Sequence, residues 1–404
     1  MINNLQDALS TNIKGMKRSA IRELLKYLGT PGLISFSGGF PSPETFPTVE
    51  LKQIMNEVMD TEAAFALQYG ATEGDILLRT MLVERYKAQG IEMSVDNLII
   101  TTASQQALDL TAKIFINRGD YVLVGLPSYL GGLSAFNSYG AQMIGIPMDD
   151  EGEDPAVIEK ELKRVEAMGK KVKFIYLIPD FQNPAGVTMT EKRRQEIIAL
   201  AHKYDVLIIE DSPYRELRYE GSTQKTMYEL DGTGHVVMLG TFSKIFCPGF
   251  RIGWVAGHPD ILDKFVVAKQ ATDLCTPPFT QRIAARYLEK GLLDPKIEEI
   301  RQMYSVKQKG FLAALDKYMP EEITWTRPKG GLFMMASAPE YMDTDELLLQ
   351  CIKEENVAYV AGTSFFCDGG GKNTMRLNFS YETLEKNEEG AKRLGNFFKK
   401  QLKK

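Results

Sequence analysis

The segment TFSKIFCPGFR, from Thr241 to Arg251, holds the residues of this chain whose types and spacing most clearly suit chemistry. Lys244 follows the apolar run 236–240, which predicts a buried strand, so its amine would lie at the end of a sheet in a partly dry pocket. There a lysine can lose its proton and form a Schiff base with an aldehyde. Thr241 and Ser243 add hydroxyls, and the guanidinium of Arg251 suits a phosphate. Pyridoxal 5'-phosphate combines both groups and is the ligand that this segment indicates.

Three residues elsewhere in the chain suit the ring of that molecule. Asp211 ends the run VLIIED, and a carboxylate at the end of a buried strand is costly unless it meets a cation or hydrogen-bond donors. The protonated ring nitrogen would be such a partner, and the pair would keep the ring able to accept electrons. Tyr214, three residues on, and Asn183, in the turn PDFQNPAG, could hydrogen-bond the phenolic oxygen. Taken singly, Asp211 could cap a helix and Asn183 could form a turn.

The phosphate needs several donors, which the start of a predicted helix would offer. Ser104 and Gln105 open the stretch SQQALDLTAKIF directly after the apolar run 97–102. A helix amino terminus has free N–H groups and a favourable dipole, so with the hydroxyls and guanidinium of the lysine segment it would complete a phosphate cup. Ser104 alone could be an ordinary N-cap. Tyr129, in LPSYLGG, could stack on the ring, with a plain core tyrosine as the alternative.

These residues follow apolar runs that predict the strands of one sheet. Runs rich in Val, Ile and Leu alternate with amphipathic helical patterns, which indicates an α/β fold with a mostly parallel central sheet wrapped by helices. The runs cover 97–102, 121–127, 142–148, 172–179, 206–211, 236–242 and 251–257. In open sheets of this kind ligands bind beyond the carboxyl ends of the strands, which is where the candidate residues fall.

The 404 residues suffice for two lobes of unequal size. After Pro259 helical patterns prevail, including a long one at about 295–319 that would bridge the lobes. A smaller mixed unit follows, with strands predicted near ITWTRP, GLFMMAS, VAYVAG and MRLNFS. We therefore expect an N-terminal arm that covers the active site (1–38), a large cofactor-binding domain (39–294) and a small C-terminal domain (295–404).

Composition argues against several other classes of protein. The chain is 44% hydrophobic and 25% charged with a net charge of −5, whereas a nucleic-acid surface needs a basic excess. No apolar stretch reaches membrane-spanning length and the amino terminus is too polar for a signal peptide, so we expect a cytoplasmic location. The four cysteines form no CxxC pair and the three histidines are isolated along the chain, so we expect neither a disulfide framework nor a metal site.

The lysine segment, DSPY and NPAG together resemble the motifs of class I and II aminotransferases, in the family's order along most of the chain. The resemblance implies fold type I, pyridoxal 5'-phosphate as cofactor, and ping-pong transfer of an amino group from an L-amino acid to a 2-oxo acid. It also implies a homodimer in which Tyr69 reaches the neighbour's cofactor phosphate. Arg376, in MRLNFS, resembles the family's carboxylate-binding arginine, and Gly39 would let backbone approach the same carboxylate.

The stretch SAIRELLK followed by SFSGGFPSPETFP is most similar to the subgroup that includes 2-aminoadipate and kynurenine aminotransferases. The substrates implied are 2-aminoadipate, glutamate, and aromatic or branched amino acids, and Arg22 resembles an arginine that can meet a distal carboxylate. Ala103 departs from the pattern, because glycine is common there in relatives.

Two other interpretations stay open. One is a lyase or synthase of the same fold that eliminates a side-chain group, which needs the same lysine, aspartate and arginine. The other is a non-catalytic effector-binding module of a transcription regulator. The family's motifs begin within the first forty residues, which leaves no room for a DNA-binding head.

Overall fold

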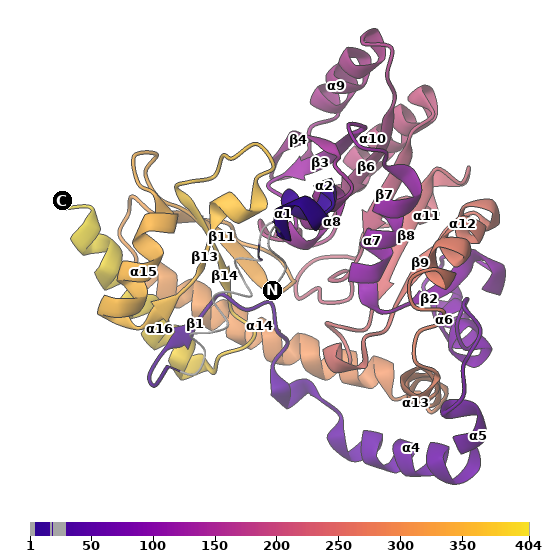
Figure 1. The fold of residues 1–404 in the computed structure, drawn as a ribbon. Helices are drawn as coiled ribbons and strands as arrows, with labels where there is room; N and C mark the ends of the chain where they lie inside the picture. Colours follow the sequence, from indigo (N-terminus) through magenta and orange to yellow (C-terminus); the bar gives the residue numbers. More distant parts are fainter. Residues whose placement is uncertain (1–4, 17, 19–29, 404) are drawn as a thin grey trace.

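The structure is a computed structural model that describes residues 5–16, 18 and 30–403. A large unit built on an eight-stranded sheet lies beside a smaller unit built on a four-stranded sheet (Figure 1). The predicted α/β fold, with a mostly parallel central sheet and a second, smaller α/β unit, is confirmed.

The strands of the large sheet are β2 (Leu98–Thr101), β3 (Tyr121–Leu126), β4 (Gln142–Asp149), β5 (Gly152–Glu153), β6 (Val172–Leu177), β7 (Leu207–Asp211), β8 (Val236–Thr241) and β9 (Gly253–Ala256). Their order is β2-β9-β8-β7-β6-β3-β4-β5. Pairing is parallel from β8 through β7, β6 and β3 to β4, whereas β9 runs antiparallel to both neighbours and β5 to β4. Nearly every residue of β6, β7 and β8 is buried, as runs of Val, Ile and Leu require in a sheet covered on both faces.

The helices of the large unit flank this sheet and extend beyond its β2 edge (Figure 1). They are α4 (Thr48–Thr61), α5 (Ala63–Ala66), α6 (Ile76–Ala88), α7 (Ala103–Phe115), α8 (Leu130–Ser138), α9 (Pro155–Ala167), α10 (Glu191–Tyr204), α11 (Met227–Asp231), α12 (Pro259–Gln270) and α13 (Pro278–Glu289). Local sequence sets several of their ends. The side chain of Thr190 accepts a hydrogen bond from Arg193 N at the start of α10, and Asp205 ends that helix in the left-handed region (φ 48°).

The small unit contains an antiparallel sheet of order β10-β11-β14-β13. Its elements are β10 (Thr324–Trp325), β11 (Phe333–Ser337), α15 (Thr344–Glu355), β12 (Val357–Ala358), β13 (Val360–Ala361), β14 (Thr374–Asn378) and α16 (Leu384–Gln401). β12 pairs in parallel with β1 (Ile34–Ser35) instead of joining that sheet. Residues 34–35, which lie in the predicted arm, therefore pair with the small unit.

The helix α14 (Leu293–Tyr318) runs between the hydrophobic cores of the two units (Figure 1). Ile297 and Ile300 belong to the core of the large unit, while Phe311 and Leu315 belong to the core of the small one. Phe36 packs on Phe311 with ring centroids 4.8 Å apart. The long helix predicted at about 295–319 thus contacts both cores.

Two short helices precede this framework, α1 (Leu5–Ala8) and α2 (Thr11–Lys14), and α2 contacts the large unit. Asn12 accepts a hydrogen bond from Arg118, and Asn137 donates one to the carbonyl of Gly15. Among the described residues, no helix combines the length and apolar character that crossing a bilayer requires.

The three histidines are isolated along the chain, as stated above, but two of them are neighbours in space. His258 caps the start of α12, where its ring accepts a hydrogen bond from Asp260 N. His202 and His235, however, lie together with ring centroids 5.0 Å apart. They are distant in sequence and meet because α10 and β8 both contact α11.

Candidate active site

The predicted site residues gather where the strands of the large sheet end. A cavity of about 430 Å³ lies there, between the carboxyl ends of the parallel strands and the small unit. The predicted residues that line it are Gly39, Ser104, Gln105, Tyr129, Asn183, Asp211, Tyr214, Thr241, Ser243, Lys244, Arg251 and Arg376. Tyr69 does not line it and is 81% exposed, and Arg22 lies outside the described residues.

Lys244 presents its amine to this cavity directly after the fully buried strand β8. Its Nζ donates a hydrogen bond to the carbonyl oxygen of Gly39 at 2.8 Å. Desolvation, together with the guanidinium groups of Arg376 and Arg251, lowers the lysine's pKa from 10.5 to about 8, although Asp211 opposes the shift. About a tenth of the amine is therefore unprotonated at pH 7, far more than for a lysine with the ordinary pKa, and the neutral form is the nucleophile.

Other buried lysines differ from Lys244 in their partners. Lys269 pairs with Asp273 at 2.7 Å, and Lys307 donates to the carbonyl of Ser380 at 3.1 Å with Glu44 at 3.8 Å. Lys244 has no carboxylate within ion-pair distance among the described residues. This makes it the buried lysine best suited to react.

Asp211, at the end of β7, has one oxygen satisfied and one without a partner. Its Oδ2 accepts a hydrogen bond from the hydroxyl of Tyr176 at 2.8 Å, whereas Oδ1 has no hydrogen-bond partner among the described residues. Burial raises the carboxyl's pKa to about 7, against the opposing effects of Tyr176 and Lys244. Because buried polar atoms are nearly always paired, Oδ1 indicates a missing donor.

A chain of polar contacts connects Tyr214, Asn183 and Arg376. The Asn183 amide donates to the Tyr214 hydroxyl at 3.2 Å, and its carbonyl oxygen accepts from Arg376 Nη1 at 3.0 Å. Burial raises the pKa of the tyrosine. Arg376, on β14, also donates to the carbonyl of Ser37 at 2.8 Å, so one residue of the small unit links three segments at the cavity.

Arg376 is a buried cation that has no carboxylate within ion-pair distance in the part of the chain that the structure describes. Only 1% of the residue is exposed, its Nε has no hydrogen-bond partner among the described residues, and burial lowers its pKa to about 10. Its guanidinium carbon lies 4.1 Å from the ring centre of Phe333 and 5.2 Å from that of Phe365. Such a group strongly favours an anion that can accept two parallel hydrogen bonds.

The other end of the cavity collects donors at the start of α7 and around β8. Ser104 and Gln105 lie in the first turn of α7. The Thr241 and Ser243 hydroxyls are 2.9 Å apart, and Ser243 N donates to the Thr241 hydroxyl. Arg251 adds a guanidinium from a left-handed residue (φ 53°). Free N–H groups, hydroxyls and a cation together suit a phosphate.

Ala103, which departs from the family's pattern, adopts a left-handed backbone with φ 61° at the start of α7. This conformation strains residues that carry a Cβ, which explains why glycine suits the position. Gly253 packs against it, and a Cβ there would lie 2.6 Å from Ala103 C and 2.7 Å from Ser104 N. The close approach of β9 sets the position of this helix start.

Tyr129 lies at the N-cap of α8, and its hydroxyl donates to Gln105 Oε1 at 3.4 Å. A Cβ at Gly131 would lie 2.5 Å from the Tyr129 ring, so glycine is required for the ring to occupy this position. The tyrosine thus forms one wall of the cavity.

Sequence reasoning missed Tyr176 and Phe333. Tyr176 lies in β6 among Val, Ile and Leu, and its hydroxyl is the only signal that it does more than fill the core. Phe333 begins a strand that the sequence predicts, but nothing in the sequence shows that its ring packs on Arg376. Both contacts join segments far apart in the chain.

The described residues fit pyridoxal 5'-phosphate. The unpaired oxygen of Asp211 suits the ring N–H, Lys244 suits the aldehyde, and the donors around Ser104 and Arg251 suit the phosphate. The buried guanidinium of Arg376 remains for a carboxylate.

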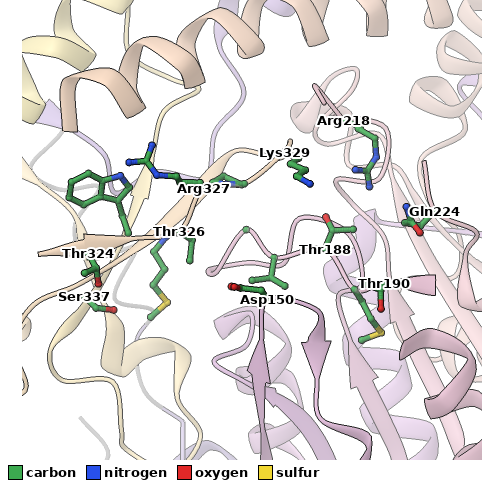
Figure 2. A pocket seen from close by; sticks show the side chains of 16 residues that line it. Asp150, Thr188, Thr190, Arg218, Gln224, Thr324, Thr326, Arg327, Lys329 and Ser337 are labelled. Carbon is green, nitrogen blue, oxygen red and sulfur yellow. Dashed lines mark hydrogen bonds between the residues drawn. The ribbon is translucent and has the colours of Figure 1, made fainter. Parts of the chain in front are cut away.

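A second cavity, of about 690 Å³, lies along residues 186–190 and 324–329 (Figure 2). Cationic side chains line one side of it, Arg218, Arg327 and Lys329, while Thr188 and Asp150 lie across from them. None of the predicted residues that the structure describes lines this cavity, so its greater size does not make it the catalytic site.

Comparisons with known proteins agree with this geometry. The family model "Aminotransferase class I and II" matches residues 33–394. The aromatic-amino-acid aminotransferase 1 of Thermococcus litoralis is 48% identical over 391 residues, 96% of this chain and 94% of the relative. The 2-aminoadipate transaminase of Thermus thermophilus is 38% identical over 389 residues, 95% of this chain and 94% of that protein. The crystal structure of the Pyrococcus horikoshii kynurenine aminotransferase in complex with PMP has a TM-score of 0.96 at 46% identity and covers 100% of both chains.

Proposed function

Because the chain belongs to the class I and II aminotransferases and is a pyridoxal-phosphate-dependent enzyme, we propose that its transamination depends on Lys244 and the residues around it. One observation carries the proposal. Two groups line the same cavity at the ends of adjacent parallel strands, β7 and β8. They are the amine of Lys244, whose pKa is lowered to about 8, and the oxygen of Asp211 that has no donor among the described residues.

When bound, the cofactor supplies an aldehyde for the substrate's amine and a protonated ring that accommodates the electrons freed at the substrate's α carbon. Asp211 keeps a proton on the ring nitrogen, and Tyr176 keeps Asp211 ionised by donating to its other oxygen. Lys244 carries the proton between the α carbon and the cofactor's aldehyde carbon. Arg376 binds the substrate's carboxylate through its fork of N–H groups, with the backbone of Gly39 close by.

The remaining residues hold the cofactor in place. Asn183 and Tyr214, which are hydrogen-bonded to each other, would hold the phenolic oxygen, and Tyr129 would pack on the ring. The phosphate is bound by the start of α7 and the residues around β8, namely Ser104, Gln105, Thr241, Ser243 and Arg251.

We propose aromatic amino acids as the preferred donors, with 2-aminoadipate, glutamate and branched amino acids as further substrates. The cavity wall includes the apolar side chains Phe40, Pro41, Leu130, Ile178 and Phe333, which suit a large apolar substituent. The relatives named above act on aromatic amino acids, 2-aminoadipate and kynurenine, by their names. A distal carboxylate would be met by Arg22, which remains a prediction from sequence.

A panel of amino acids added singly to the holoenzyme tests this assignment. Each true donor converts the bound cofactor to its aminated form in a single half-reaction, which changes its absorbance. We expect the largest second-order rate constant for aromatic donors. Release of pyruvate and ammonia without aminated cofactor would instead support the lyase interpretation.

We also propose a cytoplasmic homodimer in which Tyr69 of one protomer contacts the cofactor phosphate of the other. Tyr69 is exposed, and so are several large hydrophobic residues near it in the sequence, Met59, Phe65, Leu67 and Ile76. Exposed apolar side chains on this part of the large unit favour burial against a second copy. We also propose that the chain divides into an N-terminal arm (1–38), a large domain (39–294) and a small domain (295–404). The helix α14 would connect the two domains.

A further inference from the structure

His202, Asp231 and His235 converge at the edge of the large sheet opposite the active site. His202 lies in the last turn of α10, Asp231 ends α11, and His235 directly precedes β8. One possible ligand atom from each, two imidazole nitrogens and a carboxylate oxygen, lies within 4.8 Å of the others. Lys244 follows the other end of β8, about 20 Å away at the rise of a strand, so this cluster is separate from the catalytic cavity.

The three residues face a common point, which the hydroxyl of Thr233 occupies. Its Oγ1 lies 2.9 Å from His202 Nε2, 2.6 Å from Asp231 Oδ1 and 2.8 Å from His235 Nδ1. A metal ion bound by imidazole and carboxylate ligands sits about 2.0–2.2 Å from each. His202 Nε2 and Asp231 Oδ1 are also hydrogen-bonded to each other at 2.6 Å, so a metal ion would replace this bond as well as the threonine hydroxyl. Each donor would need to move by less than about 1 Å to reach these metal–ligand distances.

The surroundings hold these ligands in orientation, as the outer contacts of metal sites do. The second oxygen of Asp231 accepts hydrogen bonds from Gly234 N at 2.8 Å and Val236 N at 3.2 Å. The second ring nitrogen of His235 faces Asp205 Oδ1 at 3.5 Å. At this distance the carboxylate does not hydrogen-bond the ring, but it could orient the ring if the two moved closer, as carboxylates do beside histidine ligands.

We propose that His202, Asp231 and His235 form a binding site for a divalent transition-metal ion such as zinc, nickel or cobalt. Two imidazoles and one carboxylate form a ligand set that such ions favour over magnesium or calcium, which prefer oxygen alone. The side chains of His202 and His235 are 36% and 26% exposed, so water can reach the site and complete the coordination shell. Bound metal would join α10, α11 and β8 and stabilise this edge of the sheet.

Isothermal titration of the untagged holoenzyme with zinc chloride or nickel chloride tests the site. We expect one equivalent per chain, with the affinity reduced at least about tenfold in His202→Ala and in His235→Ala. Thr233→Ala removes the hydroxyl from the common point and should bind more tightly than the wild type. His258→Ala, which removes the histidine outside the cluster, is the matched control and should bind like the wild type.

Two further measurements guard against misfolding and against binding elsewhere. The thermal midpoint of the wild type should rise with added metal, and that of His235→Gln, a milder change, should not. Cobalt bound at the site should show visible absorption bands that disappear in the histidine variants. Metal binding that is equal in wild type, His202→Ala and His235→Gln, or no binding by the folded wild type, would show that the cluster is a hydrogen-bonded network only.

Discussion

At the scale of single residues, the chemistry rests on groups whose ionisation the fold has shifted. Burial and two guanidinium groups favour the neutral form of Lys244, and burial disfavours the carboxylate of Asp211. Each shift prepares its group for a partner that the cofactor brings, an aldehyde for the amine and a ring N–H for the carboxylate. This pairing explains why, among the described residues, Asp211 Oδ1 has no hydrogen-bond donor and Lys244 has no carboxylate partner.

The pKa of Lys244 sets the pH dependence of cofactor uptake by the apoenzyme. Only the neutral amine attacks an aldehyde, so the rate constant should rise about tenfold per pH unit below the pKa and level off above about 8. Stopped-flow absorbance from pH 6 to pH 10 measures the profile. A rate that kept rising to pH 10.5, the ordinary value for lysine, would show that the site leaves its pKa unchanged.

Tyr176→Phe removes the hydrogen-bond donor to Asp211 Oδ2 and should therefore disfavour the ionised form of the Asp211 carboxyl. A hydrogen bond to a charged group contributes about 1.5–3 kcal/mol, so we expect kcat to fall by roughly 10- to 100-fold with little change in KM for the amino acid. Cofactor affinity of the apoenzyme should fall as well. Tyr359→Phe removes a buried hydroxyl that donates to the Thr344 carbonyl in the small unit, and this control should change neither quantity.

At the scale of elements, the carboxyl ends of parallel strands and the start of one helix position most of the groups proposed to hold the cofactor. β6, β7 and β8 deliver the turn with Asn183, Asp211 and the lysine segment to one edge, and α7 starts there with its free N–H groups. The left-handed Ala103 and the glycine against which it packs fix the helix start.

Substitutions at this helix start should act in opposite directions. Ala103→Gly relieves the left-handed strain and should raise the free energy of unfolding by about 1 kcal/mol, measured by urea denaturation of the apoenzyme. Gly253→Ala places a Cβ against the backbone of residues 103 and 104, so it should lower stability and weaken phosphate binding. Equal stability of all three proteins would contradict the strain argument.

Much of this element scale could be predicted from the sequence, because buried parallel strands show as apolar runs. Each of the seven predicted runs contains a strand of the large sheet. The predicted strand VAYVAG is instead two short strands with different partners, and the two-residue strands β1 and β5 carry no sequence pattern. Their pairing depends on tertiary contacts, as does the contact of Tyr176 with Asp211.

At the scale of the whole molecule, the active site depends on how two units meet. Arg376 belongs to the small sheet, yet it contacts Ser37 and Asn183, and α14 packs in both cores. On the proposed roles, the small unit would bind the substrate carboxylate and the large unit would hold the cofactor.

The proposed dimer adds a second chain to that arrangement. Leu67→Glu places a charge among the exposed apolar residues near Tyr69 in the sequence and should shift the protein to a monomer, which light scattering measures. It should also weaken cofactor binding, which an absorbance titration measures. Leu349→Glu changes another exposed leucine, on α15 at the far end of the molecule from α5 (Figure 1), and this variant should remain dimeric. A monomeric wild type that binds cofactor fully would exclude a role for Tyr69 across an interface.

The central claim is that Lys244 is the residue that joins the cofactor covalently. Reduction of the holoenzyme with borohydride, followed by mass spectrometry of its peptides, locates the attached lysine directly. We predict that the pyridoxyl group is found on Lys244 and that Lys244→Ala shows no attachment while it remains folded. Attachment to Lys269 or Lys307, or to no lysine, would contradict the account.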